Sequence, residues 1–283
     1  LESITNQPSL AFNYAQAGQE NSFTWSNMEE GLKMQFPLFE SLRKKGKIKI
    51  ETLESTGKWF KDHFTVTPAT AVTTLTDIKK EGNKTVWFNS RFYRASLLWE
   101  KDGFCFRDIH LFDENLQSDY LTTPGTGNQF FYQTLPVIDR FYWSTPEEKN
   151  GLRIMQLEDD GTLKEVILED PVVTEPAMDV LCVSASDGKG NRFEIVFYEN
   201  KIDISYQGDK KDFTWMMALK VPESRKDRLP FESFEGTVLR AKFKGFPYKV
   251  TCEEGRIQKR DKTEYDLRMI PNEHKLVINL TNR

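Results

Sequence analysis

The chain has 283 residues, of which 38% are hydrophobic and 13% aromatic, and this apolar content excludes a disordered chain. The formal net charge is −4, with acidic and basic residues interspersed, so nucleic acid is not an expected partner, because phosphate binding requires a basic surface. No apolar run approaches the length of a membrane-spanning segment, so no membrane span is expected.

The first strong signal is one substantial helix that begins near Ser26. Ser26 and Glu29 have the spacing of a capping box, in which each side chain satisfies a free backbone amide. The apolar residues that follow recur at helical spacing and form one stripe: Leu32, Phe36, Phe39 and Leu42. Gly46 is a suitable left-handed C-cap, whereas Pro37 predicts a kink or a division of the helix.

A short β-prone run, Lys47–Leu53, follows this helix directly. A helix that leads straight into a strand is typical of an α/β repeat. One repeat cannot close a barrel. We therefore expect residues 1–65 to form an α/β unit, the tail of a barrel.

Residues 66–283 predict strands almost throughout. Val86–Trp99 alternates and turns into Phe104–Phe112, and Phe193–Tyr198 forms a hairpin with Lys201–Tyr206. Many strands at short spacing without helices between them indicate antiparallel sheets. The predicted fold is mainly β, a large antiparallel β-sandwich preceded by the remnant α/β unit.

The three cysteines, Cys105, Cys182 and Cys252, are isolated in the sequence. No Cys-x-x-Cys or Cys/His spacing of a zinc site occurs, so no metal site and no cofactor are predicted. The surroundings of Cys105 and Cys182 favour small buried hydrophobic residues. One disulfide with a leftover thiol is an alternative.

The residues after the inferred barrel strand are the first candidate site. α/β barrels place their active sites at this end of the strands. Glu51 and Glu54 are the candidate catalytic pair, and Trp59 and His63 are candidate ligand-binding residues. A sugar site needs acid–base groups and a flat apolar face for a pyranose ring. The alternative is that the two acids are solvated charges and Trp59 belongs to the core.

The first β-hairpin is the second candidate site. Arg91 and Arg94 are candidate ligand-binding residues beside the tryptophans of this hairpin. Arg107 and Asp108 are placed to pair across a sheet face. His110 titrates near neutral pH when unperturbed. The alternative is a structural Arg–Asp network at a boundary between domains.

The stretch Gly46–Phe60 resembles the closing part of polysaccharide-deacetylase-like and related glycoside-hydrolase barrels. The stretches 86–94 and 106–113 are similar to the β-domain attached to such barrels in secreted proteins of polysaccharide-degrading gut bacteria. The likeness covers about the first 115 residues. The His-x-x-x-His motif of the deacetylases is absent, since His63, His110 and His274 are the only histidines.

The resemblance implies the C-terminal accessory region of a secreted carbohydrate-active enzyme, which supports a catalytic barrel upstream and its glycan cleft. The implied partners are a polysaccharide or oligosaccharide and that barrel. The alternative is a stand-alone carbohydrate-binding or cell-surface module, and an intact enzyme that uses Glu51 and Glu54 is a third. The chain begins at Leu1 rather than Met, which a cleaved secretion signal, proteolysis or an artificial boundary would each explain. The expected location is secreted, periplasmic or at the cell surface.

Overall fold

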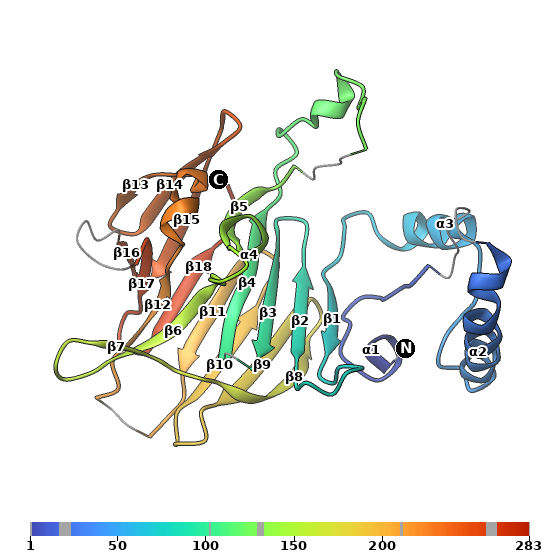
Figure 1. Ribbon diagram of the computed structural model, residues 1–283, viewed down its shortest axis with the longest axis horizontal. Helices are drawn as coiled ribbons and strands as arrows, with labels where there is room; N and C mark the ends of the chain where they lie inside the picture. Colours follow the sequence, from blue (N-terminus) through green and yellow to red (C-terminus); the bar gives the residue numbers. More distant parts are fainter. Residues whose placement is uncertain are drawn as a thin grey trace.

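The computed structural model describes residues 2–16, 24–101, 103–128, 133–209, 212–258 and 265–282. Two large antiparallel sheets stack face to face, and a helical extension projects from one edge (Figure 1). The prediction of a mainly-β antiparallel sandwich is confirmed. None of the described helices is both long enough and apolar enough to cross a membrane.

The first sheet holds the two strands of the first predicted hairpin near its start. Its strands follow one another in the order β1 (Thr70–Thr74), β2 (Lys84–Asn89), β3 (Tyr93–Glu100), β4 (Gly103–Leu111), β6 (Leu152–Leu157), β12 (Trp215–Leu219), β17 (Leu267–Ile270) and β16 (Arg256–Gln258). Two further strands pair beside this path, β5 (Leu135–Asp139) with β4 and β7 (Leu163–Glu165) with β6. The expected strand Val86–Trp99 is divided into β2 and β3 by a turn at residues 90–92.

The second sheet runs in the order β13 (Phe231–Glu235), β14 (Val238–Phe243), β15 (Phe246–Glu254), β18 (Lys275–Asn279), β11 (Lys201–Tyr206), β10 (Arg192–Phe197), β9 (Val180–Ser186) and β8 (Glu169–Ala177). The predicted hairpin around Glu199 forms as β10 and β11. Phe193, Ile195 and Phe197 all face the core, as their alternation requires.

The two sheets share one continuous apolar core. Phe88 of β2 stacks on Phe197 of β10 with ring centroids 5.4 Å apart. The hydroxyl of buried Tyr93 donates across the sandwich to the carbonyls of Tyr198 and Lys201, at 2.8 and 3.0 Å. A buried phenol requires such partners, because an unmade hydrogen bond costs about 1–3 kcal/mol.

The short helices are α1 (Glu2–Thr5) near the N-terminal end and, in the connections between strands, η1 (Asp119–Leu121), α4 (Arg140–Trp143) and η2 (Glu223–Arg228). The predicted long helix is confirmed as α2 (Trp25–Lys44). It begins two residues earlier than the capping box implied, with Thr24 instead of Ser26 at the N-cap and without a side-chain cap hydrogen bond, and it continues across Pro37.

The prediction of a strand at Lys47–Leu53 is wrong. Residues 47–52 are irregular, and a second helix, α3 (Leu53–His63), follows them. The Thr52 hydroxyl caps this helix by accepting from the amide of Ser55 at 3.2 Å. Glu54 and Lys58 add an ion pair of helical spacing at 2.6 Å. Among described residues 24–65, the predicted α/β unit therefore consists of helices without a strand.

We call residues 24–64 the helical arm, because α2 and α3 lie beyond β1 at the edge of the first sheet (Figure 1). No residue of either helix is buried. The large apolar residues of this arm that are exposed are Trp25, Met34, Phe36, Leu38, Ile50 and Leu53. An amphipathic surface helix normally buries its apolar stripe, so this arm presents apolar surface that the sandwich does not cover.

The three cysteines are free thiols, and Cys105 and Cys252 are buried while Cys182 is half-buried. Burial raises the pKa of the Cys252 thiol to about 12 and also raises the pKa of Cys105. Since the thiolate is the reactive form, iodoacetamide at mildly alkaline pH should label Cys182 first in the native chain. Cys105 and Cys252 should react only after unfolding, and native labelling should disappear in Cys182→Ser. Mass spectrometry measures the labelling rate at each cysteine. Equal rates at all three sites would contradict this burial pattern.

Candidate functional site

The polar face of the first sheet brings together Asp108 and His110 of β4 and Asp139 at the end of β5, which we call the Asp–His–Asp cluster. These side chains lie on the sheet face opposite to the core residues Ile109 and Leu111. Each of the three is at most 6% exposed. One nitrogen or oxygen from each lies within 4.8 Å of the other two. Burying ionisable groups this close together lowers the stability of the fold unless they bind a partner, so such clusters are candidates for functional sites.

A β-bulge and a helix cap position the two carboxylates. The register between β3 and β4 shifts so that Ser96 faces Asp108, and the extra residue is Arg107. Arg107 Nε lies 3.3 Å from Asp108 Oδ2, so the predicted Arg–Asp pair forms. Asp139 faces Asp108 across the β4–β5 ladder and caps α4 by accepting from the amide of Tyr142 at 2.9 Å.

Hydrogen bonds on the outer side leave two atoms of the cluster facing each other. His110 Nδ1 lies 2.7 Å from the Thr134 hydroxyl, and Asp139 Oδ1 is occupied by the amide of Tyr142. The remaining atoms, His110 Nε2 and Asp139 Oδ2, are 3.6 Å apart. Together with one oxygen of Asp108, one ligand atom from each residue lies within 4.8 Å of the others.

Burial governs the protonation of all three groups. Burial, with a further contribution from Arg94, lowers the pKa of His110 to about 3, so the imidazole is neutral at neutral pH. Burial raises the pKa of Asp108 above its ordinary range, against the opposing effects of Arg107 and Arg94. Burial also raises the pKa of Asp139, and the charge of Asp108 raises it further.

Two arginines flank the cluster beside Trp87. The Arg94 and Arg107 guanidinium carbons lie 6.0 and 5.7 Å from the centre of the Trp87 ring. Arg94 faces His110 across the ladder, and its Nε is buried without a hydrogen-bond partner among the described residues. The Ser96 hydroxyl is completely buried and also lacks a partner within the described part of the chain.

The predicted catalytic pair lies on the helical arm, at the start of α3. Glu51 accepts from the Thr56 hydroxyl at 3.0 Å, and Glu54 pairs with Lys58 at 2.6 Å. Both acids are exposed, and both are engaged by neighbours in sequence. The prediction that these two acids lie at the carboxyl end of a barrel strand is wrong, because that strand does not form.

Trp59 and His63 also belong to α3. The Trp59 ring contacts Phe12 edge-on at 5.8 Å and Phe64 at 5.6 Å, and it is half-buried. His63 lies against the same ring at 5.0 Å, with Nδ1 2.8 Å from the Trp59 carbonyl oxygen. Trp59 therefore ties the arm to the N-terminal segment through aromatic packing.

The two arginines predicted to bind a ligand separate. Arg91 is exposed in the β2–β3 turn and pairs with Glu199 at 2.8 Å. Arg94 enters the vicinity of the Asp–His–Asp cluster, because it is the register partner of His110. The sequence analysis did not identify Asp139 or Thr134 as site residues. The only sequence feature that pointed to Asp139 is its position as a carboxylate at the end of an apolar run.

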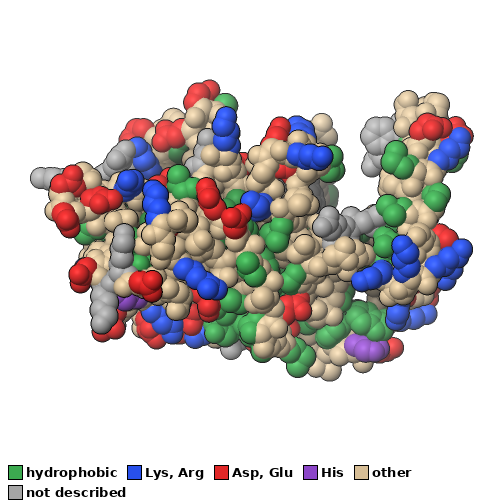
Figure 2. Space-filling view, turned by 90° about the horizontal axis from the view of Figure 1, so that it is seen from below, with side chains coloured by type: hydrophobic (Ala, Val, Ile, Leu, Met, Phe, Trp, Pro, Cys, Tyr) green, Lys and Arg blue, Asp and Glu red, His purple; other side chains and the backbone are tan. Residues whose placement is uncertain are grey.

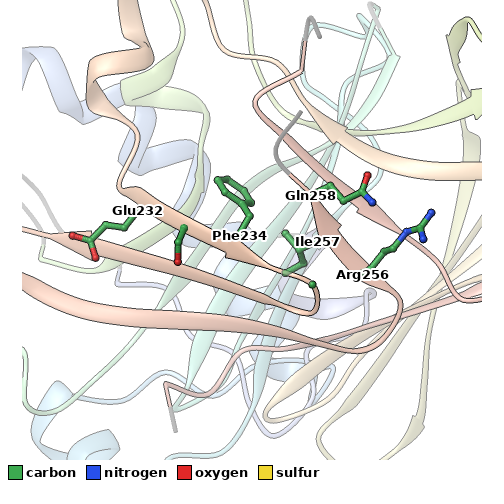
Figure 3. A pocket seen from close by; sticks show the side chains of 7 residues that line it. Glu232, Phe234, Arg256, Ile257 and Gln258 are labelled. Atoms are coloured by element: carbon green, nitrogen blue, oxygen red, sulfur yellow. The ribbon is translucent and has the colours of Figure 1, made fainter. Parts of the chain in front are cut away.

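Two open hollows lie away from the cluster and the arm. One, of about 530 Å³, is lined by Glu232, Phe234, Arg256, Ile257 and Gln258 from β13 and β16 (Figure 3). The other, of about 610 Å³, lies around the acidic turn between β6 and β7. Neither hollow gathers buried ionisable groups among its described residues, and the acids around the second one are exposed or half-buried, so the Asp–His–Asp cluster is the stronger candidate site.

The fold defines this chain as a two-sheet antiparallel β-sandwich protein with a helical arm. No family model and no curated protein sequence matches it. It is similar at 11% identity to YidC from Thermotoga maritima, with a TM-score of 0.39, over 76% of this chain and 51% of that one. It is similar at 12% identity to an active YidC insertase with the first transmembrane domain resolved, with a TM-score of 0.41, over 82% and 45%. The chain spans about half the length of both structures, and likenesses this weak assign neither a family nor an activity.

The raised pKa of Asp139 makes a stability prediction. A carboxyl group whose folded-state pKa is raised stabilises the fold while it is protonated, and this contribution is lost as pH rises through that pKa. Asp139→Asn keeps an N-cap of equal quality and removes the charge, so at neutral pH with a chelator present its Tm should equal or exceed that of the wild type. The difference should shrink on acidification.

Asp139→Ala is the matched control, because it removes the charge and the cap of α4 together. It should be less stable than Asp139→Asn by about 1 kcal/mol. Thermal melts followed by circular dichroism decide the matter. An Asn variant that melts as low as the Ala variant would mean that the folded chain requires the charge itself.

Proposed function

We propose that the chain is the β-sandwich accessory region of a secreted carbohydrate-active enzyme, and that its helical arm packs against the catalytic α/β barrel of that enzyme. The observation that supports this most is the helical arm. A helix of 20 residues without one buried residue is incomplete as a folded unit.

The apolar surface of the arm is large enough to drive an association. Its six exposed apolar side chains are between 48% and 75% accessible. Burying a large apolar side chain contributes about 1.5–3 kcal/mol. The charged residues of α2 do not oppose this, because they pair within the helix, as Lys33 does with Glu29 at 2.7 Å and Arg43 with Glu40 at 2.6 Å. Figure 2 shows hydrophobic side chains on the surface of this arm, at the right of the view.

The carbohydrate part of the proposal is supported by two resemblances. Residues 46–60 resemble the closing part of glycoside-hydrolase-like barrels, and the first hairpin resembles the β-domain attached to them. Glu51, Glu54 and Trp59 then lie where the arm meets the barrel, beside its glycan cleft. Carboxylates bind sugar hydroxyls, and an indole face packs against a pyranose ring.

A stand-alone carbohydrate-binding module is the second candidate, and α4 favours it. Phe141 and Tyr142 are 76% and 43% exposed, and their rings meet edge-on at 5.2 Å. They belong to the helix that Asp139 caps, so two aromatic side chains lie close in sequence to the polar cluster. Exposed aromatic rings commonly pack against sugar rings in carbohydrate-binding proteins. A stand-alone module with such a surface would not require a catalytic barrel.

The arm predicts a measurable apolar surface in the isolated chain. ANS fluorescence should be high in the wild type and fall strongly in Met34→Asp/Leu38→Asp, with an unchanged Tm, because neither residue packs in the core. Ile78→Asp is the control, since Ile78 is even more exposed than Met34 and Leu38 but lies on the β1–β2 connection. In hydrogen exchange, α2 should be less protected than β3. Strong protection of α2 in the monomeric chain would contradict an uncovered arm.

Glycan binding separates the two candidate functions. Affinity electrophoresis against a panel of neutral and acidic polysaccharides should show retardation by at least one of them. If the arm borders the glycan cleft, Glu51→Gln/Glu54→Gln should weaken retardation while Phe141→Ala/Tyr142→Ala leaves it unchanged. The opposite result supports the stand-alone module. All four positions are exposed, so these variants should fold normally. No retardation by any polysaccharide would contradict the carbohydrate assignment.

A further inference from the structure

The geometry points to a binding site for one divalent transition-metal ion, such as Zn²⁺ or Mn²⁺, formed by Asp108, His110 and Asp139. This inference is independent of the proposed carbohydrate function. The sequence holds no metal-binding spacing, because the three residues come from two strands that pair only in the folded sheet.

The donor set suits such an ion. One imidazole nitrogen and two carboxylate oxygens are ligands that Zn²⁺ and Mn²⁺ accept, whereas Ca²⁺ and Mg²⁺ prefer oxygen alone. With bonds of about 2.1 Å, two ligands of one ion lie at most about 4.2 Å apart. His110 Nε2 and Asp139 Oδ2 already meet this limit at 3.6 Å. The third atom lies within 4.8 Å of both, so a small rotation of the Asp108 carboxylate completes the set.

The surrounding hydrogen bonds are those of a supported metal site. Metal-binding histidines usually hold their second nitrogen in a hydrogen bond, and metal-binding carboxylates are themselves hydrogen-bonded. Here Thr134 occupies His110 Nδ1, and the amide of Tyr142 occupies Asp139 Oδ1. The other two atoms of these residues, His110 Nε2 and Asp139 Oδ2, then lie 3.6 Å apart.

Ser96 provides a second, independent observation. Its side chain is fully buried, and its hydroxyl has no hydrogen-bond partner among the described residues. It faces Asp108 in the β3–β4 register, so it lies on the same side of the sheet as the cluster. A buried hydroxyl without a partner is unfavourable. A water molecule on a metal ion held by three protein ligands would supply the missing hydrogen bond.

Arg94 and Arg107 limit how tightly the ion binds. Arg107 pairs with Asp108, and Arg94 faces His110. Both cations oppose a third one at short range. We therefore expect micromolar rather than nanomolar affinity.

The experiment uses the full, untagged chain after treatment with a chelator. Mn²⁺ binding is followed by electron paramagnetic resonance and Zn²⁺ binding by calorimetry. The expected result is one ion per chain, with binding abolished in Asp139→Asn, which retains the cap of α4. Thr134→Val should weaken binding by about tenfold or more, as loss of an outer hydrogen-bond partner does.

Two control variants test whether the ion binds at exposed surface residues instead of at the cluster. Asp160→Asn changes an exposed acid in the β6–β7 turn, and His63→Ala removes the exposed histidine of the arm; neither should change the affinity. Circular dichroism establishes that each variant is folded. Binding that survives in Asp139→Asn, binding that is lost in His63→Ala, or no binding up to about 1 mM, the weakest range of specific affinity, would each overturn the proposal.

Discussion

The rest of the sandwich depends on the contact between the β2–β3 turn of the first sheet and the β10–β11 turn of the second. Tyr93 crosses the core to donate to two carbonyls of the opposite turn, and the Ser90 hydroxyl donates to the carbonyl of Glu199 at 2.6 Å. Outside the core, Arg91 pairs with the side chain of Glu199. Hydrogen bonds are directional, whereas apolar packing is not, so these contacts fix how the sheets align. The alignment holds β3 in place, and β3 in turn sets the register of β4.

The polar cluster is a consequence of that register, and it acts against stability. The same strand β4 offers Ile109 and Leu111 to the core and Asp108 and His110 to the opposite face. Burial disfavours the charged form of each ionisable group in the cluster, as the directions of their pKa shifts show. Residues that work against the fold while being held by a bulge, a cap and a hydrogen-bonded threonine are typical of functional sites.

The sequence predicts those features that depend on short-range periodicity. Alternation gave the β10–β11 hairpin and the two-sheet fold, and helical spacing gave α2. It failed at Lys47–Leu53, where Ile48 and Ile50 have β propensity but no neighbouring strand to pair with, while Thr52 caps a helix. The cluster could be predicted only in part. Arg94, Asp108 and His110 follow from one hairpin, but the place of Asp139 depends on a strand that returns to β4 after a long connection.

The arm and the cluster are connected through the edge of the first sheet. Residues 9–11, ahead of the arm, pair with residues 69–71 at the start of β1, and Glu175 of β8 accepts from the amides of Ser9 and Leu10 at 2.7 and 2.6 Å. The chain therefore leaves this edge and returns to it, so the arm is anchored at both ends. The same pairing covers the free side of β1, which an unprotected edge strand requires. A protein domain that packs on the arm would therefore lie near β1. In the first sheet, β1 is two strands away from β3, which carries Arg94 on the same polar face as the cluster.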